Sequence, residues 1–484
     1  MKLFESPIQR RSLLVVAGAT ALVASMPRIL RAASVDKDMR LAPAPGRVPL
    51  LGGNRPETDV WCYNSQVPGP EIRLHQGERL RVTVRDGLKQ DTTVHWHGIR
   101  VPNAMDGAPY VTQPPIEPGA SFVYEFTVPD AGTYWYHSHA HSSEQIGRGL
   151  SGPFIVEEPA PPAVDRDVVW LLGDYRLEPD ASIAGGFDNP MEMSMAGRIG
   201  NTVTINGRVP ETFAVRSGER IRLRLINGAP ARIFGLEFRR HRPLVVALDG
   251  QPIAPHAPEG GRVILAPAQR IDLVLDMTGK PGSKATVADT FYKKLSYRLV
   301  DIAYTDEPPL RTTPVAPPAQ LPRNTMPEPD VANARRHLVT LTGGMMSGAG
   351  MGGMMGGSGM GGMMGGSGMT RGSAMWAING VAMPGDDMAH LKPALTLARG
   401  KSYILTIDNQ TAWYHPIHLH GHSFRVITRN GESTKYREWR DTVLISPRER
   451  ADIAFVADNP GDWMFHCHIL DHQDGGMMAV MRVT

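Results

Sequence analysis

Cysteine is almost absent from this sequence, whose 484 residues include only Cys62 and Cys467. The two lie far apart in the chain, which excludes the disulfide framework of a small secreted domain. Cys467 instead stands between two histidines in His466-Cys467-His468, with His472 and Met477 shortly after it. A thiolate, two imidazoles and a thioether are the ligands of a blue-copper electron-transfer site. This stretch therefore predicts a metal site for which one histidine has still to be found.

Long apolar runs and a strong charge of one sign are also missing. Beyond the amino-terminal region no stretch of 18 apolar residues occurs, and the net charge is only +3. A membrane-spanning helix needs about 20 apolar residues, and attraction to nucleic acid or an acidic membrane surface needs a large positive charge. We therefore expect a soluble mature protein with no nucleic-acid or membrane partner, and we expect it to be a monomer.

The amino-terminal region has the features of an export signal. Two adjacent arginines in Ile8-Gln-Arg-Arg-Ser-Leu-Leu14 precede an apolar run over Leu13 to Met26, and small residues follow around Ala32 to Ser34. The run is shorter than the ~20 residues of a membrane anchor, which is the alternative interpretation. The pattern predicts a twin-arginine signal over residues 1–34 that is cleaved near its end. We therefore expect the twin-arginine export machinery as a partner and the periplasm as the location.

Proline and glycine are plentiful, with 41 and 51 residues, and argue against a helical protein. Alternating runs such as Arg79 to Arg85, Phe122 to Val128 and Arg220 to Ile226, separated by turn residues, are typical of an all-β sandwich protein. Similar glycine-led strand patterns at Gly77, Gly218 and Gly400 indicate one sandwich repeated three times. The composition predicts units at residues 35–160, 161–305 and 336–484, with a proline-rich linker at 306–335.

A methionine-rich segment interrupts the third unit. Residues 345–369 hold nine methionines and twelve glycines, and the stretch 350–358 recurs without change at 359–367. Glycine leaves too little apolar area for a packed core, so we expect a flexible loop. Thioethers select Cu(I), which favours a soft-ligand role. The alternative is a low-complexity repeat without function.

Histidine forms the clearest pattern in the chain. Residues i and i+2 of a strand point to one face, roughly 7 Å apart, so each His-x-His pair directs two imidazoles at one volume. Two such pairs fall in the first unit and two in the third, which predicts a cluster of eight imidazoles between these units. The pairs are His95/His97, His137/His139, His418/His420 and His466/His468. Alternation turns the Cys467 sulfur to the opposite face, so Cys467 links this cluster to a single-metal site whose missing ligand is His415.

From about residue 45 to its end, the chain resembles the multicopper oxidases, a family that includes laccases, bilirubin oxidases and bacterial cuprous oxidases. The four copper-binding motifs of that family stand here in order, as HWHG at 95–98, YHSH at 136–139, HPIHLHG at 415–421 and HCHILDHQDGGM at 466–477. The resemblance implies three cupredoxin-like Greek-key β-sandwiches and four copper ions. It assigns a type 1 copper to His415, Cys467, His472 and Met477, a type 2 copper to His95 and His418, and a type 3 pair to His97, His137, His139, His420, His466 and His468.

The resemblance also implies the activity, in which four one-electron oxidations are coupled to the reduction of O2 to two waters. Proton delivery needs an acid near the cluster. Asp106 matches the family carboxylate beside the type 2 copper, although an Asp-Gly pair is also typical of a turn. The Cu(I)-oxidising relatives have a second acid six residues after the cysteine. This chain has Gln473 there, with Asp474 next to it, so a second relay is not predicted.

The methionine-rich segment makes the chain most similar to the periplasmic copper-tolerance cuprous oxidases (CueO type), and Cu(I) is the expected substrate. The enteric members bind substrate copper through Asp and Met at positions where this chain has Thr411 and Trp413. That site is therefore not expected here. A laccase-like phenol oxidase is the alternative, and a structural or copper-storage protein is a remote one, since all the expected ligands are present.

The remaining candidates receive simpler interpretations. His141 and His422 exceed the family's ligand number, so we expect them around the cluster or at the surface. Cys62 is expected to be a buried apolar thiol. The methionines of Met191 to Met195 could hold copper, but one face of a strand is the preferred interpretation.

Overall fold

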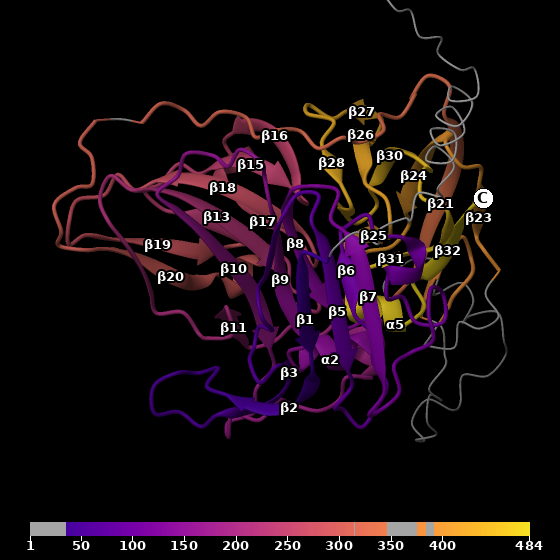
Figure 1. Ribbon diagram of the computed structural model, residues 1–484, viewed down its shortest axis with the longest axis horizontal. Helices are drawn as coiled ribbons and strands as arrows, with labels where there is room; N and C mark the ends of the chain where they lie inside the picture. Colours follow the sequence, from indigo (N-terminus) through magenta and orange to yellow (C-terminus); the bar gives the residue numbers. More distant parts are fainter. Residues whose placement is uncertain (1–34, 314, 346–374, 384–391) are drawn as a thin grey trace, which may run out of the picture. The chain divides into compact units, whose positions relative to one another are not determined.

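The computed structural model describes residues 35–313, 315–345, 375–383 and 392–484. The expected signal segment at 1–34 and all but the first residue of the methionine-rich segment lie outside the described residues. The described chain is built almost entirely of β-strands arranged as three two-sheet sandwiches (Figure 1).

The first sandwich packs the sheet β1-β5-β7 against the sheet β4-β9-β8-β6, and β2 pairs with β3 beside them. Its strands are β1 (Lys37–Leu41), β2 (Pro43–Val48), β3 (Thr58–Tyr63), β4 (Ile72–His75), β5 (Arg79–Arg85), β6 (His95–His97), β7 (Ser121–Thr127), β8 (Gly132–His137) and β9 (Ser151–Glu157). The short helices η1 (Asn103–Met105) and α2 (Ser142–Gly147) follow β6 and β8.

The second sandwich consists of the sheets β11-β10-β13-β18-β15-β16 and β12-β20-β19-β14-β17. Its strands are β10 (Arg166–Tyr175), β11 (Thr202–Ile205), β12 (Thr212–Val215), β13 (Arg220–Asn227), β14 (Phe234–Phe238), β15 (Leu244–Leu248), β16 (Gln251–His256), β17 (Val263–Leu265), β18 (Arg270–Asp276), β19 (Lys284–Asp289) and β20 (Tyr297–Tyr304). Its helical turns are α3 (Pro190–Met193), η2 (Glu259–Gly261) and η3 (Lys293–Leu295). The described residues between β20 and the next strand form neither helix nor strand.

The third sandwich consists of the sheets β22-β21-β24-β30-β26-β27, with β28 beside β26, and β23-β32-β31-β25-β29. Its strands are β21 (Arg335–Gly343), β22 (Trp376–Ile378), β23 (Leu395–Leu397), β24 (Ser402–Asn409), β25 (His415–Leu419), β26 (Phe424–Arg429), β27 (Glu432–Ser433), β28 (Trp439–Arg440), β29 (Thr442–Ile445), β30 (Arg450–Val456), β31 (Gly461–Cys467) and β32 (Met478–Val483). The helix α5 (Leu470–Asp474) separates β31 from β32.

The three sandwiches repeat one strand arrangement. In each, the first strand of the unit pairs in parallel with the strand that follows the glycine turn, as β1 with β5, β10 with β13 and β21 with β24. The last strand likewise pairs in parallel with an earlier one, as β9 with β4, β20 with β12 and β32 with β23. The turn glycines Gly77, Gly218 and Gly400 all have positive φ. The predicted internal repeat is therefore present in the strand order.

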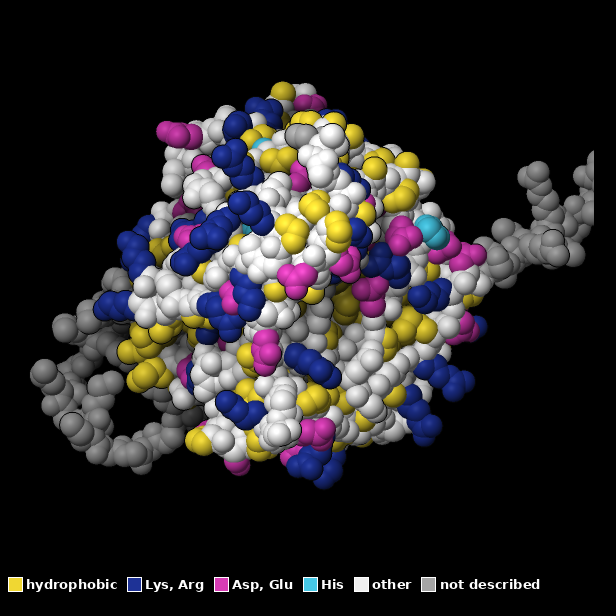
Figure 2. Space-filling model, turned by 90° about the vertical axis from the view of Figure 1, so that its left-hand side faces the viewer, with side chains coloured by type: hydrophobic (Ala, Val, Ile, Leu, Met, Phe, Trp, Pro, Cys, Tyr) yellow, Lys and Arg dark blue, Asp and Glu magenta, His cyan; other side chains and the backbone are white. Residues whose placement is uncertain are grey.

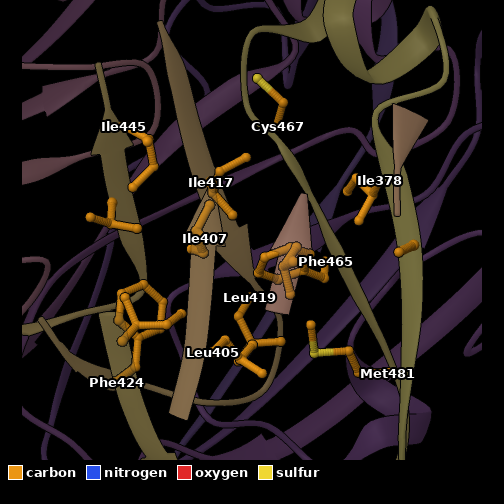
Figure 3. Packing of buried hydrophobic residues seen from close by; sticks show 14 of the residues in the cluster. Ile378, Leu405, Ile407, Ile417, Leu419, Phe424, Ile445, Phe465, Cys467 and Met481 are labelled. Carbon is orange, nitrogen blue, oxygen red and sulfur yellow. The ribbon is translucent and has the colours of Figure 1, made fainter. Parts of the chain in front are cut away.

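Side chains from both sheets of the third sandwich fill its core (Figure 3). Leu405 of β24 and Phe465 of β31 are fully buried there, and burying such a side chain contributes about 1.5–3 kcal/mol. Cys467 stands at the upper end of this cluster, so the packed core holds the strand that presents the sulfur.

The prediction for Met191 to Met195 was wrong, because the segment begins as the helical turn α3 and not as a strand. The side chain of Asn189 accepts hydrogen bonds from the backbone N–H groups of Met191 and Glu192, and Pro190 occupies the first helical position. An Asn cap followed by proline favours the start of a helix over a strand.

The surface bears charges of both signs. On the face that Figure 2 shows, Lys and Arg side chains alternate with Asp and Glu, and hydrophobic side chains form only small groups. In the described part of the chain, no helix is long and apolar enough to cross a membrane.

Candidate metal centre

Two pairs of antiparallel strands bring the eight histidines of the His-x-His motifs together. In the first sandwich His95 of β6 lies opposite His137 of β8, and in the third His418 of β25 lies opposite His466 of β31. Ring centroids within each motif are 4.8–5.9 Å apart, and rings from the two sandwiches stack directly, with 3.9 Å between His95 and His420. All eight side chains are buried. One interdomain cluster therefore contains the whole predicted set.

Most of these imidazoles have one nitrogen held by the surrounding protein. Nδ1–H of His95 donates to the backbone oxygen of Asp106, and Nδ1–H of His418 donates to that of Asp441, both at 2.8 Å. His137 and His466 donate from Nδ1 to the carbonyl oxygens of Ser138 and Cys467, at 2.8 and 2.9 Å. A carbonyl can only accept, so Nε2 of each of these rings bears the lone pair.

Nitrogens of different rings face one another across the cluster. Nε2 of His420 is 3.0 Å from Nε2 of His466, and Nε2 of His137 is 3.4 Å from both Nδ1 of His97 and Nε2 of His468. Nε2 of His95 and of His418 has no hydrogen-bond partner among the described residues. Buried acceptors that lack a donor are costly, so the cluster fits cations placed between the rings.

A second group surrounds Cys467. Its sulfur is 3.5 Å from Nδ1 of His415 and 3.6 Å from Nδ1 of His472, and those two nitrogens are 3.1 Å apart. The outer nitrogens are fixed, because Nε2 of His415 bonds Thr411 Oγ1 at 2.8 Å and Nε2–H of His472 donates to the backbone oxygen of Met195 at 2.7 Å. Met477 is fully buried in the same core cluster, and its backbone bonds both Cys467 and His472.

The protonation states in this environment suit metal binding. Burial lowers the pKa of the imidazoles of His466 to about 4 and of His472 to about 3, and it lowers the pKa of His97, His137, His139, His415, His418, His420 and His468 as well. Burial also raises the pKa of the Cys467 thiol. Neutral imidazoles are ready ligands, and a buried thiol ionises when a cation takes the place of its proton. The donor set of two imidazoles, a thiolate and a thioether is that of a mononuclear copper site.

Sequence comparison identifies the family. Three family profiles, each described as multicopper oxidase, match residues 47–161, 166–297 and 368–484. The multicopper oxidase MmcO of Mycobacterium tuberculosis is 30% identical over 465 residues, which cover 90% of this chain and 85% of that protein. The chain belongs to the multicopper oxidase family.

Other multicopper oxidases match over similar lengths. Laccase-1 of Fomitopsis schrenkii is 31% identical, covering 86% of this chain and 81% of that protein. The crystal structure of a multicopper oxidase from Pseudomonas thermotolerans superposes with a TM-score of 0.80 at 33% identity, covering 93% of this chain and all of that one. The sandwiches are therefore cupredoxin-like, the cofactor is copper and O2 is the electron acceptor, as predicted.

Asp106 contacts two histidines of this multicopper oxidase's cluster. The carboxylate accepts from Nδ1–H of His420 at 2.8 Å, while its backbone oxygen accepts from His95. The residue is fully buried, and its Oδ1 has no hydrogen-bond partner among the described residues. It also ends the turn η1, and a β-carbon at Gly107, where φ is positive, would overlap the carbonyl oxygen of Val94. The turn therefore places an acid against the cluster, although its role as a proton relay stays a prediction.

The other sequence candidates belong to neither group of metal-ligating side chains in the described structure and have partners of their own. Gln473 is buried and donates to Ser142 Oγ at 3.3 Å. His422 is buried between Phe455 and Trp463, while His141 pairs with Asp91 at 2.9 Å where α2 begins. The expectation that Cys62 is a buried thiol is confirmed.

Sequence reasoning missed residues that bond the outer nitrogens of the histidines. Asp441 and Thr442 contact both His97 and His418. Asp441 in turn forms an ion pair with Arg270 of the second sandwich. The only sequence signal was an Asp-Thr pair ahead of an apolar strand, which by itself does not indicate a site.

The copper-free protein is expected to lose stability as the pH falls. Between the lowered pKa values in the folded state, about 3 for His472 and about 4 for His466, and the ordinary value of about 6.5, the unfolded chain binds more protons than the folded one. Folding stability therefore rises with pH across this window and falls on acidification. Calorimetry should show the melting temperature of copper-free protein dropping between pH 7 and about 5. A melting temperature that stays constant over this range would contradict the burial of neutral imidazoles.

Proposed function

We propose that this multicopper oxidase oxidises Cu(I) to Cu(II) with O2 as the acceptor, and that it protects the periplasm against copper. The proposal rests mainly on where the methionine-rich segment joins the described fold. Met345, the first residue of the segment, lies beside the histidines of the mononuclear group, and so do Met375 and Trp376, where the described chain resumes.

At the first end, the backbone of Met345 bonds two neighbours of that group. Its N–H donates to the carbonyl oxygen of Ser194, and its own oxygen accepts from Trp413 Nε1, both at 2.9 Å. Ser194 directly precedes Met195, whose carbonyl oxygen bonds His472. The backbone of Met345 is therefore linked to His472 through Ser194 and Met195, and the Met345 side chain is exposed to solvent.

Where the described chain resumes, the backbone N–H groups of Met375 and Trp376 donate to the backbone oxygen of Gly475 in the loop before Met477. The Trp376 ring lies 4.3 Å from the ring of His472 and 5.1 Å from that of His415, measured between centroids. The described chain therefore stops at Met345 and resumes at Met375, and both points lie beside the mononuclear group. Its thioethers are the soft ligands that Cu(I) prefers.

The ligand assignment rests on the family motifs, and the ring nitrogens that face one another support it. We assign the type 1 copper to His415, Cys467, His472 and Met477, the type 2 copper to His95 and His418, and the type 3 pair to His97, His137, His139, His420, His466 and His468. When bound, copper supplies one-electron storage, so that four single-electron oxidations match the four electrons that O2 needs to become two waters. Cys467 ends β31 and stands between His466 and His468 in the chain, so the chain itself joins the two groups through a few covalent bonds.

Met195 and His472 define where electrons enter. Nε2–H of His472 is capped by the Met195 carbonyl oxygen, and the ring is fully buried. The molecule that donates the electron therefore approaches the chain around Met195 and does not touch the His472 imidazole. A small cation held by thioethers meets that condition more readily than a bulky phenol.

The periplasmic location rests on the amino-terminal pattern. Two arginines followed by a short apolar run and small residues support export by the twin-arginine machinery, which transports folded proteins. The monomeric state stays a prediction.

Phenol oxidation of the laccase type is the second candidate. Laccase-1 shares 31% identity with this chain, and a CueO from Ochrobactrum, named for oxidase activity towards lignin model compounds, shares 26%. In that case the methionine-rich segment would only cover the site.

Deleting residues 346–369 separates the two candidates. Met345 is kept because its backbone bonds anchor the segment. We expect Cu(I) oxidation at low copper to fall, and oxidation of a bulky phenol to rise or stay level. The blue absorption should persist because no assigned ligand lies in the deleted stretch.

A matched control replaces the eight methionines of residues 346–369 by leucine, which keeps the length and removes the sulfur. This variant should lose Cu(I) oxidation without gaining phenol oxidation. A Cu(I) rate that survives both changes at low copper would favour the laccase function. Equal losses on both substrates in the deletion would mean that the segment is structural.

A further inference from the structure

The second sandwich contributes to the cluster although no metal-ligating group among the described residues contains any of its side chains. Arg270 of β18 is fully buried and directs its guanidinium at Asp441, with Nη1–Oδ1 and Nη2–Oδ2 distances of 2.8 and 2.5 Å. Two parallel bonds to one carboxylate fix the orientation of both partners. Arg270 also donates to the backbone oxygens of Thr133 and Ala268, both at 3.1 Å. This arginine therefore connects all three sandwiches.

Asp441 in turn accepts hydrogen bonds from two histidines of the cluster. Its Oδ1 accepts from Nε2–H of His97 at 3.2 Å, and its backbone oxygen accepts from Nδ1–H of His418 at 2.8 Å. Thr442 Oγ1 lies 3.0 Å from Nε2 of His97 and 3.2 Å from Nδ1 of His418. The contacted nitrogens are the outer ones, since Nδ1 of His97 and Nε2 of His418 are turned to the cluster. Asp441 therefore orients these rings and does not complete a further metal site.

Other residues pack closely against the ion pair of Arg270 and Asp441 or bond the chain next to it. A β-carbon at Gly98, directly after His97 and with φ of +86°, would overlap Arg270 Nη2 and Asp441 Oδ2. Asp249 of the second sandwich accepts from the backbone N–H of Arg270 at 2.9 Å and from that of Thr442 at 3.4 Å. Gln269 Nε2 donates to the backbone oxygen of Thr442 at 3.0 Å. Side chains of the second sandwich thus bond both the side chain of Asp441 and the backbone of Thr442.

We propose that Arg270 is a positioning residue for the copper cluster, which it supports through Asp441 and Thr442 by fixing the ring orientation and tautomer of His97 and His418. His97 comes from the first sandwich and His418 from the third, so the second sandwich sets how the ligands of the other two face each other. The inference rests on the proposed assignment of His97 to the type 3 pair and of His418 to the type 2 copper. Partners that bond the outer nitrogen of a metal-bound histidine raise metal affinity about 10–100-fold.

The test compares Arg270→Met with Arg222→Met in the full copper-loaded protein. Arg222 is an equally buried arginine of the second sandwich, but its guanidinium bonds Glu158 and Asp272 and contacts no cluster histidine. Both variants remove a guanidinium from buried carboxylates and should melt at lower temperature. After dialysis at low free copper, only Arg270→Met should lose the type 2 copper signal in electron paramagnetic resonance, with an apparent affinity about 10–100-fold lower. The blue absorption of the mononuclear site should persist in both.

Thr442→Val provides a second variant if Arg270→Met does not fold, because it removes the hydroxyl beside both histidines and leaves the ion pair intact. It should weaken the type 2 signal in the same direction. A type 2 signal equal to wild type in Arg270→Met, or in Thr442→Val where the first does not fold, would overturn the proposal, as would an equal loss in Arg222→Met. His418→Ala tests the assignment separately, since a type 2 signal that survives it would show that the ligand assignment itself is wrong.

Discussion

Replacing Cys467 with serine is expected to abolish both the intense blue absorption and all oxidase turnover, while copper stays in the histidine cluster. The thiolate is the ligand responsible for the blue colour of such sites. It is also the residue that joins them, since its sulfur lies 3.5 and 3.6 Å from the mononuclear histidines and its chain neighbours belong to the cluster. A serine hydroxyl neither ionises readily nor binds copper as a soft ligand. Absorption spectroscopy, copper analysis and oxygen uptake measure the three outcomes.

Cys62→Ser is the matched control for this substitution. Cys62 is also fully buried, and its sulfur donates only a weak contact to the backbone oxygen of Ala44 at 3.6 Å. The control should keep colour and turnover, with at most a lower melting temperature. Steady turnover in Cys467→Ser would contradict the role of Cys467 as the link between the two groups.

Asp106→Ala is expected to slow O2 reduction by about 10²–10⁴-fold, the usual range for losing a general acid. At saturating copper all copper and the blue band should remain, because Asp106 bonds only the outer nitrogens of His95 and His420 and is not an assigned ligand. Under turnover the mononuclear site should accumulate in its reduced, colourless form, since electrons enter faster than they leave. Stopped-flow absorption during oxygen uptake would follow this.

Asp106→Asn separates proton supply from hydrogen bonding, because the amide oxygen still accepts from His420 but has no carboxyl proton to give. It should be as slow as the alanine variant. Asp86→Asn is the matched control, as Asp86 is a buried aspartate of the same sandwich whose carboxylate accepts from the backbone of Leu88. Wild-type oxygen consumption in both Asp106 variants would leave Asp106 as a turn residue only.

The two groups of histidines around the candidate metal sites could be predicted from the sequence because their signal is local. His-x-His motifs on strands reveal by alternation alone which side chains share a face, and Cys467 between two histidines reveals that two sites adjoin. The repeat of strand patterns likewise gave the three sandwiches. These inferences need only neighbouring residues and the period of a strand.

Contacts between sandwiches could not be predicted in that way. Arg222 and Arg224 occupy the polar positions of an alternating run, which favours exposure, yet both are buried against acidic residues where the first and second sandwiches meet. Arg270 and Asp441 are 171 residues apart, and nothing in the surrounding sequence pairs them. The covering of His472 by Met195 depends on a helical turn of another sandwich. Periodicity reports which face is polar, but it does not report what packs against that face.

The central claim is that one copper lies beside Cys467 and three lie among the eight histidines, and anomalous diffraction at the copper edge from crystals of the copper-loaded protein tests it most directly. The account predicts one peak between His415, Cys467 and His472, and three peaks enclosed by His95, His97, His137, His139, His418, His420, His466 and His468. No peak is expected between His97, His418 and Asp441 on the outer side of the cluster. A missing peak at Cys467, or copper bound through Asp441 in place of the inner nitrogens, would contradict the account.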